Sequence, residues 1–452
     1  MSDAATAERG RESVDSHPFV SRPHRTFALL SAPVLASLII EPLTGLVDTG
    51  FVAQLGAVPL ASLGAATQVL SSLFWIFNFL GIGTQTEVAR ATGSGDTAGG
   101  RDAASLALGL AFVIGTMVAL LGWLGTPAAL AFMSDDPAMH ESMRSYLTIR
   151  LLGSPAVLVS FAGFGALRGL QEMRTPLWIA AGANLVNLVL DPLLIFGAGP
   201  VPAYGVAGAA TASVVAQWIG AVWTLAAVRK RMGLASRVPW SHAPALLVVG
   251  RDLFLRTGLL TLFLLFATRA ATRLGADAGA AHQVVRQVWF FTAFLLDAYA
   301  AAAQSLVAGF LGAGRADLAR RVAWVAGQWA VATGVLLGGL MLLGEAAVAA
   351  ALVPTGALSM FAPAWWLLAL AQPLNAISFV TDGIHWGTRD YAYLRNAMFV
   401  STAAGLLGIA SLPHTPDALA WVWLVTAGWI SVRASFGVLR IWPGIGAAPL
   451  DG

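Results

Sequence analysis

Long apolar stretches separated by short polar connections run through the chain from about residue 27 to about residue 440. A helix needs about 20 apolar residues to cross the hydrocarbon core of a membrane. The stretches that meet this requirement are residues 27–52, 60–90, 102–125, 143–167, 176–198, 204–228, 252–274, 280–311, 322–344, 363–387, 394–412 and 417–439. The pattern therefore predicts an all-α integral membrane protein with about twelve transmembrane helices.

Composition agrees with this prediction. The 452 residues are 57% hydrophobic and 11% charged, whereas a soluble domain is about 25% charged. The formal net charge of +3 arises from basic residues that lie between the apolar stretches and form no continuous patch, which argues against nucleic acid as a partner.

Several chemistries are excluded by residue types. The chain has no cysteine, and its single lysine, Lys230, follows no Gly-rich loop, so disulfides and a Walker A site are ruled out. The seven histidines form no HExxH pattern, and no clustered catalytic constellation is visible. We expect no enzymatic activity, no bound metal and no cofactor apart from a coupling ion.

The basic residues predict the orientation. They concentrate in the N-terminal tail, in the even-numbered connections and after the last span, and the centres of the odd-numbered connections hold none. Positive residues accumulate on the cytoplasmic side. We therefore expect a multi-pass protein of the plasma or inner membrane with both termini in the cytoplasm.

The two halves of the chain resemble each other. Leu55-Gly56-Ala57 recurs as Leu274-Gly275-Ala276 and Gln85 as Gln304, with one common offset in the numbering. A second set, whose offset is shorter by one position, pairs Pro155 with Pro373, Phe161 with Phe379, Gly165 with Gly383 and Gly169 with Gly387. Because each half contains six spans, both halves enter the membrane from the same side. Parallel repeats of this kind are a transporter architecture.

The repeat predicts the domain boundaries. We expect a disordered cytoplasmic tail over residues 1–26, six-helix lobes over 27–230 and 252–441, a cytoplasmic linker over 231–251 and a second tail over 442–452. A cleavable signal peptide is the alternative for the N-terminus. The apolar run there is too long for one and is interrupted by Glu41 and Pro42.

Polar residues at membrane depth are candidate functional residues, because an ionisable group is costly to bury in lipid. With a rise of about 1.5 Å per residue, Asp48, Asp191 and Thr211 fall in the outer half of the first lobe. Asn187 precedes Asp191 by one helical turn, so both lie on one face. We predict that these four residues form a proton- or cation-coupling site.

Two prolines accompany the acids of this site: Pro42 precedes Asp48, and Pro192 follows Asp191. A proline inside a helix kinks it and frees a carbonyl. A carboxyl in a low-dielectric environment favours its protonated form and can exchange a proton, and together with amide and hydroxyl oxygens it also suits Na⁺. The structural alternative is that Asp48 caps a helix end and Asp191 belongs to a helix-end turn.

Three further acids are candidates. Asp297 and Asp382 fall in the inner half of the second lobe, where they form either a second cation site or ion pairs with arginines. Glu41 lies seven residues before Asp48, on roughly the same helix face, as a proton relay or as a polar partner across the bundle.

Aromatic side chains suggest how a substrate is held. The candidates for stacking and cation–π contact with flat apolar cations are Trp75, Phe77, Phe79, Trp289, Phe290 and Phe291. The alternative is that these side chains face lipid.

Five segments, in this order and spacing, resemble a known family. They are Pro42-Leu-Thr-Gly-Leu-Val-Asp48-Thr, Leu167-Arg-Gly-Leu-Gln-Glu-Met-Arg-Thr-Pro176, Asn184-Leu-Val-Asn-Leu-Val-Leu-Asp191-Pro192, Gly205-Val-Ala-Gly-Ala-Ala-Thr211 and Asp382-Gly-Ile-His-Trp-Gly387. With them the chain resembles the multidrug and toxic compound extrusion (MATE) family, in particular its DinF-like branch, over essentially its whole length after the tail.

The resemblance implies two six-helix bundles forming a V that alternates access, with drug efflux driven by inward H⁺ or Na⁺. It matches the family's first-lobe residues with Asp48, Asn187, Asp191 and Thr211, and its second-lobe acid with Asp382.

One departure from the family pattern concerns helix 7. Some members that use Na⁺ in the second lobe carry an acid there, whereas this chain has Arg269 and Arg273. The departure favours protons acting through the first lobe.

The sequence thus predicts a secondary active antiporter that exports organic cationic or amphipathic compounds in exchange for H⁺ or, second, Na⁺. We expect a monomer whose partners are a small-molecule substrate and membrane lipids. The alternative is a flippase for a lipid-linked precursor, although such proteins favour a cationic cavity. An integral membrane enzyme or receptor would need a catalytic cluster or a sizeable soluble domain, and the sequence shows neither.

Overall fold

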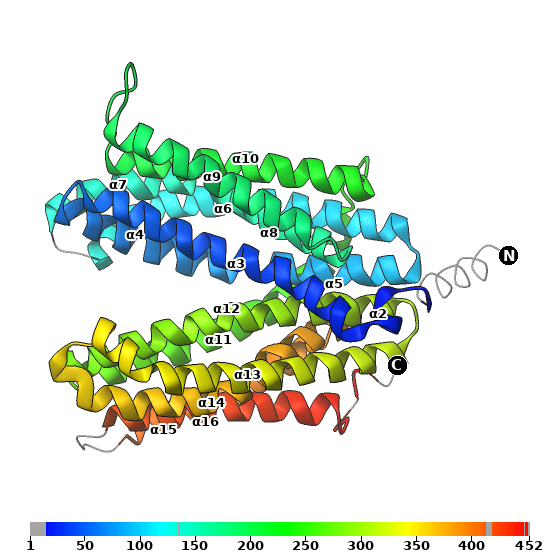
Figure 1. Ribbon diagram of the computed structural model, residues 1–452. Coiled ribbons are helices and arrows are strands. Elements are labelled where there is room, and N and C mark those ends of the chain that lie inside the picture. Colours follow the sequence, from blue (N-terminus) through cyan, green and yellow to red (C-terminus); the bar gives the residue numbers. More distant parts are fainter. Residues whose placement is uncertain (1–14, 134–135, 413–417, 447, 451–452) are drawn as a thin grey trace. The chain divides into compact units, whose positions relative to one another are not determined.

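The computed structural model describes residues 15–133, 136–412, 418–446 and 448–450. Its α-helices are α2 (Pro18–Ser21), α3 (Pro23–Ala53), α4 (Ala57–Ile76), α5 (Phe79–Ser94), α6 (Thr97–Met133), α7 (Pro137–Leu151), α8 (Ser154–Gly169), α9 (Arg174–Phe196), α10 (Val206–Met232), α11 (Ala243–Arg273), α12 (Ala276–Gly312), α13 (Ala316–Leu352), α14 (Leu358–Thr388), α15 (Tyr391–Ala410) and α16 (Ala418–Ile441) (Figure 1). Two short 3₁₀ helices, Trp240–His242 and Thr355–Ala357, precede α11 and α14.

The helices confirm the predicted fold class. Within the described residues, ten spans are long and apolar enough to cross a membrane, or eleven if α7 and α8, bent by 46° at their junction, form one span. The remaining predicted span, 394–412, corresponds to the 20-residue helix α15. Large apolar side chains such as Leu343 and Phe132 are almost fully exposed, as expected of surfaces that face lipid.

Two predicted spans are broken. The stretch 60–90 forms α4 and α5, which are separated at Phe77 and Asn78, and the stretch 143–167 forms α7 and α8, which are separated at Leu152 and Gly153. Hydrophobicity averaged over a whole span does not reveal such breaks, because one or two residues hardly change the average.

The chain divides into two compact units. One comprises residues 32–250, and the other comprises residues 1–31 together with 251–452. The predicted lobe boundaries therefore need two changes. The region expected to be a linker, 231–251, joins the first unit almost entirely, since α10 continues to Met232 and α11 begins at Ala243. The beginning of α3 belongs to the unit of the second lobe.

The prediction of a disordered N-terminal tail is wrong from Asp15 onward; residues 1–14 lie outside the described part. Phe19 on α2 and Phe27 on α3 are fully buried in the core of the second lobe, where Phe19 lies beside Phe310 with 5.7 Å between ring centroids. Burying a phenylalanine side chain contributes about 1.5–3 kcal/mol. Two such side chains supply part of the free energy that orders this segment.

The described residues of the predicted second tail, 442–446 and 448–450, include side chains that pack on the second lobe. Leu450 is buried in the same core as Phe19, and the Trp442 ring lies 5.8 Å from that of Trp324. A tail that brings tryptophan and leucine gains by covering apolar surface that would otherwise meet water.

The internal repeat recurs in the backbone. Gln171 and Arg389 are the two non-glycine residues with positive φ among the described residues, at 59° and 65°. They are related by the same offset as Gly165 and Gly383. These two glycines each lie against a helix backbone of their own lobe, Gly165 at Gly81 and Gly383 at Ala300. The sequence matches therefore mark the same close approaches and the same turn in both halves.

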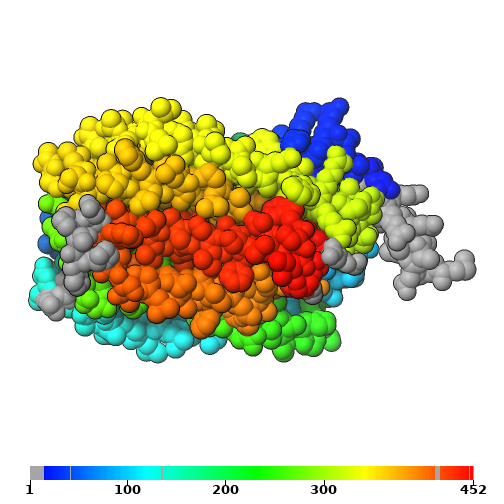
Figure 2. All heavy atoms as spheres, turned by 90° about the horizontal axis from the view of Figure 1, so that it is seen from below, coloured from blue at the N-terminus to red at the C-terminus, as the bar shows by residue number. Residues whose placement is uncertain are grey.

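Corresponding helices make corresponding contacts within each unit. In the first, α8 packs against α5, α6 and α10; in the second, its equivalent α14 packs against α12, α13 and α16. Figure 2 shows one face of the second lobe, on which α16 (red) lies between α14 and α15 (yellow to orange). The central helix of each lobe thus packs against three other helices of that lobe.

Candidate functional site

Asp48 and Asp191 come together inside the first lobe. Asp191 on α9 is fully buried, and Asp48 on α3 is partly buried. The two carboxyl groups interact directly. Oδ1 of Asp48 and both carboxyl oxygens of Asp191 are buried without a hydrogen bond of standard geometry. Two adjoining carboxyls without donors form a place that a proton or a cation stabilises.

The ends of α3 and α9 are held together by an aromatic pair. The rings of Phe51 and Phe196 meet edge to face with 6.3 Å between their centroids. Both rings lie within one or two turns of the acids on their own helices, so this contact fixes the approach of Asp48 to Asp191.

Asn187 and Thr211 complete the set predicted for this lobe. Asn187 is buried one turn before Asp191 and interacts with it, while its Nδ2 has no hydrogen-bond partner of standard geometry. Thr211 on α10 is partly buried, and its hydroxyl donates to the Ala207 carbonyl of its own helix at 2.8 Å. The structure therefore brings Asp48, Asn187 and Asp191 together, and places Thr211 on the helix that packs along α9.

Arg150 is a residue of this site that sequence reasoning missed. It lies in the last turn of α7, and its charge acts on both Asp48 and Asp191. Its Nε and Nη1 atoms are buried without hydrogen-bond partners. A signal was present in the sequence, because Arg150 falls inside the predicted span 143–167 and an arginine at that depth requires a partner.

Oxygen atoms at this site are also the kind of ligand that a hard cation takes. Asp48 and Asp191 supply carboxylate oxygens, and Asn187 supplies an amide oxygen. Among the described residues, no group of three or more His, Asp or Glu side chains is arranged to hold a metal ion.

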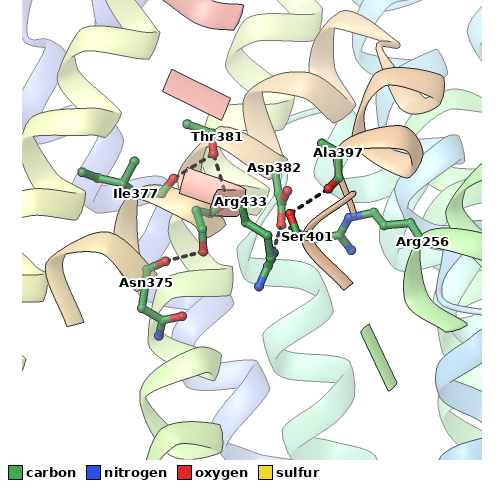
Figure 3. A network of polar contacts seen from close by, with 9 residues as sticks. Arg256, Asn375, Ile377, Thr381, Asp382, Ala397, Ser401 and Arg433 are labelled. Carbon is green, nitrogen blue, oxygen red and sulfur yellow. Dashed lines mark hydrogen bonds and ion pairs between the residues drawn. The ribbon is translucent and has the colours of Figure 1, made fainter. Parts of the chain in front are cut away.

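Asp382 of the second lobe lies in a different electrostatic setting. Its Oδ2 accepts hydrogen bonds from Nη2 of Arg256 on α11 and from Nη2 of Arg433 on α16, the second at 3.0 Å (Figure 3). All three side chains are buried. The alternative of an ion pair with arginine therefore describes Asp382. Two guanidinium groups already balance its charge, which disfavours a cation there.

The roles of the other two acids, Asp297 and Glu41, stay predictions. Asp297 is partly buried on α12 and takes part in interactions of its own. The charged groups that act on Arg433 are Asp382 and Arg256, and Asp297 is not among them. Glu41 belongs to α3, but its side chain lies outside the described part of the chain, so its role as a relay stays a prediction.

Comparisons with known proteins agree with this geometry. The MatE family profile matches residues 33–193, the segment that carries Asp48 and Asp191. The chain is 28% identical over 427 residues to Protein DETOXIFICATION 44, chloroplastic, of Arabidopsis thaliana, covering 91% of this chain and 81% of that protein. It is also 28% identical over 419 residues to DNA damage-inducible protein F of Escherichia coli (strain K12), covering 89% of each.

Solved structures show the same fold. The structure described as "Crystal structure of MATE in the bent conformation" matches with a TM-score of 0.83 and 19% identity, covering 92% of this chain and 94% of that one. The "Outward-facing conformation of a multidrug resistance MATE family transporter of the MOP superfamily" matches with a TM-score of 0.81 and 20% identity, covering 92% and 94%. The chain is similar to MATE proteins in sequence and in fold, which confirms the predicted resemblance. Its fold is that of a multi-pass membrane transporter.

One further polar cluster lies at the end of α14 and includes residues of α15 and α16. The Asp390 carboxylate pairs with Nε of Arg440 at 2.9 Å and with Nδ1 of His385 at 3.4 Å. Arg440 also lies over the Tyr393 ring, 4.6 Å from its centroid. Burial opposes ionisation of Asp390, but the hydrogen bonds and charges of His385 and Arg440 outweigh it and lower the pKa of Asp390.

The first lobe repeats that cluster in reduced form. Glu172, the repeat equivalent of Asp390, pairs with Arg231 of α10 at 2.9 Å. In both lobes an acid in the connection after the central helix is thus tied to an arginine at the end of the lobe's last helix.

The aromatic residues proposed for substrate stacking do not form one group. Trp75 and Phe291 are exposed, as expected of lipid-facing side chains, whereas Phe79 and Trp289 are buried. Phe77 lies beside Phe79 with 6.2 Å between ring centroids. The aromatic residues therefore do not identify a substrate site.

Proposed function

We propose that the protein is a secondary active antiporter that exports organic, cationic or amphipathic compounds in exchange for H⁺ by alternating access. It would act as a monomer in the plasma or inner membrane with both termini in the cytoplasm. The observation that carries this proposal is the interacting pair of Asp48 and Asp191, of whose four carboxyl oxygens three are buried without a hydrogen bond of standard geometry. Such a pair changes its charge readily when the site opens to water on either side.

The charges nearby favour H⁺ over Na⁺ as the coupling ion. Arg150 already supplies a positive charge next to both acids. That charge opposes the binding of either cation, but Na⁺ also needs several oxygen ligands around it, whereas a proton binds to a single carboxyl oxygen. In the second lobe, Arg256 and Arg433 occupy Asp382 and disfavour a further cation.

Alternating access follows from competition. If protonation of the acid pair and binding of the substrate favour opposite conformations, each ligand displaces the other, and the proton gradient drives export. The prolines Pro42 and Pro192 lie inside α3 and α9, close to the two acids. A helix that lacks one backbone hydrogen bond bends at lower cost, so these prolines would let the acids move apart when their charge changes.

The experiment uses purified protein in liposomes, with a pH gradient and a Na⁺ gradient imposed separately. A fluorescent cationic dye reports transport. We expect transport with the pH gradient alone and none with the Na⁺ gradient alone. Asp48→Asn and Asp191→Asn should each reduce transport to the level of protein-free liposomes while the protein still inserts and folds.

The matched control is Asp317→Asn, which removes an exposed acid at the beginning of α13 that pairs with Arg315. This variant should transport like the unaltered protein. Normal transport by Asp48→Asn would contradict the proposal. Transport driven by the Na⁺ gradient alone would show that the coupling ion is Na⁺ and not H⁺. Movement of a lipid-linked precursor without any gradient would favour the flippase alternative.

A further inference from the structure

The cluster of Asp382, Arg256 and Arg433 carries one more positive charge than negative. Each arginine donates to the same carboxylate oxygen, Oδ2 of Asp382, and the three residues are 6–7% exposed. Asp382 and Arg256 are the charged groups that act on Arg433. The excess charge is therefore not balanced within the cluster.

Donor groups are also left over. Nε of Arg256 and Nη1 of Arg433 are buried without a hydrogen-bond partner. A guanidinium group has five N–H donors in a planar fork. Buried donors of a charged group cost free energy when they are unpaired, so a second acceptor would lower the free energy of this cluster.

Two tryptophans fix the orientation of the guanidinium groups. Arg256 lies over the Trp386 ring at 5.5 Å from its centroid, and Arg433 lies over the Trp429 ring at 4.6 Å. Stacking holds the planar forks in place at little further entropy cost, which is the condition for bidentate recognition of an oxyanion. The rings also offer an apolar surface beside the charge.

The neighbouring arginines do not belong to this cluster. Arg251 and Arg395 both pair with Asp252, one turn before Arg256 on α11, at 2.9 Å and 2.7 Å. Arg440 pairs with Asp390. Arg251 and Arg395 share Asp252 but are more exposed, so the pair of arginines that shares Asp382 is the buried one.

We propose that Arg256 and Arg433 bind the carboxylate or phosphate group of a transported amphipathic compound, with Asp382 holding the arginines in place when that group is absent. The compound would be anionic or zwitterionic, with its anionic group between the guanidinium forks and an apolar part against Trp386 and Trp429. This proposal rests on the proposed transport function, since it assigns part of the substrate.

Equilibrium binding to the purified full-length protein tests the proposal without any ion gradient, so failure of proton coupling does not affect the result. The probes are rhodamine 110, which has a free carboxylate, and rhodamine 123, its methyl ester. Fluorescence anisotropy is measured in nanodiscs of phosphatidylcholine. We expect rhodamine 110 to bind at least about tenfold more tightly, the value of a charged hydrogen bond.

Variants of the arginines and of Asp382 are expected to change the preference for rhodamine 110 in opposite directions. Arg433→Gln and Arg256→Gln each leave one arginine paired with Asp382 and should abolish the preference for rhodamine 110. Asp382→Asn leaves both arginines without their acid and should strengthen it. A purely structural ion pair predicts no gain for Asp382→Asn. The matched control is Arg395→Gln, which removes a partly buried arginine paired with Asp252 and should keep the preference.

Three results would overturn the proposal. The first is equal binding of the two dyes to the unaltered protein, and the second is a preference that survives in both arginine variants. The third is a preference that disappears when phosphatidylglycerol replaces part of the phosphatidylcholine, which would assign the arginines to a lipid headgroup instead of a transported compound.

Discussion

Gly115 and Gly334 hold equivalent places in the two lobes and let two helices pack at the same distance. A Cβ atom on Gly115 would lie 2.5 Å from the Cα of Pro155, and one on Gly334 would lie 2.6 Å from the Cα of Pro373. The two glycines have the offset that relates Gln85 to Gln304, and the prolines belong to the second set of repeat pairs. The close approach of α6 to α8, and of α13 to α14, therefore depends on the absence of a side chain.

Gly334→Ala is expected to destabilise the second lobe. Its methyl group would overlap the backbone of α14, and overpacking of this kind costs about 1–3 kcal/mol. Thermal denaturation in detergent measures the effect. Gly339→Ala on the same helix is the control, since a Cβ there meets nothing within 4 Å, and its melting temperature should be unchanged or higher. Equal melting temperatures for both variants would contradict the packing argument.

Phe19→Ala is expected to lower stability by about 3–5 kcal/mol, as for other fully buried aromatic side chains. Phe19 lies in the core of the second lobe, so the loss should be seen in thermal denaturation of the full chain. Leu29→Ala, which alters an exposed side chain of the same segment, should have little effect. An unaltered melting temperature for Phe19→Ala would show that the N-terminal segment does not stabilise the lobe.

The ion pairs of Asp390 are expected to make the stability of the fold depend on pH. The pKa of Asp390 is lowered below its usual value of 3.8. A group whose pKa is lower in the folded state stabilises the fold above its unfolded pKa, and this contribution is lost as the pH falls through the folded pKa. The unaltered protein should therefore melt above Asp390→Asn at about pH 6, and the difference should close below about pH 3.8.

The control for this measurement is Asp102→Asn, whose carboxylate is exposed and lies 3.9 Å from Arg101. Its melting temperature should follow that of the unaltered protein across the whole pH range. A difference between the unaltered protein and Asp390→Asn that stays constant at acid pH would mean that Asp390 acts by its shape and not by its charge.

The two equivalent ion pairs should contribute unequally. Arg440→Gln leaves the partly buried Asp390 without its main partner and should cost about 1–3 kcal/mol. Arg231→Gln breaks the exposed pair with Glu172, whose arginine side chain is 53% exposed, and should cost less than about 1 kcal/mol. Denaturation of both variants under one set of conditions measures the ratio. A larger loss for Arg231→Gln would contradict the argument from burial.

Sequence patterns were sufficient for the helices and for the repeat. Apolar length identified the spans because lipid imposes the same requirement on each of them, independent of its neighbours. The matching glycines identified the repeat because a close backbone approach tolerates no other residue, as at Gly165 and Gly383. Depth along a helix identified Asp48, Asn187 and Asp191, since the rise per residue is constant.

Sequence patterns did not predict the interactions between helices that are distant in the chain. Arg256 and Arg433 are separated from Asp382 by 126 and 51 residues, and no periodicity links α11, α14 and α16 at that depth. The contribution of Arg150 to the acid pair likewise depends on how α7 packs against α4, α6 and α10 within the first lobe. Phe19 shows the same limit, because a short polar segment with few apolar residues orders only when a core accepts them.

The sequence by itself determined a twofold-repeated helical transporter and the acids of its first lobe, because the membrane filters each segment by hydrophobicity and penalises each buried charge separately. Only the tertiary structure decided the sign of the net charge around Asp382 and around the pair of Asp48 and Asp191. That sign depends on which arginines reach each acid, two for Asp382 and Arg150 beside the pair of Asp48 and Asp191. Electrostatic energy is a sum over neighbours in space, and neighbours in space are set by helix packing.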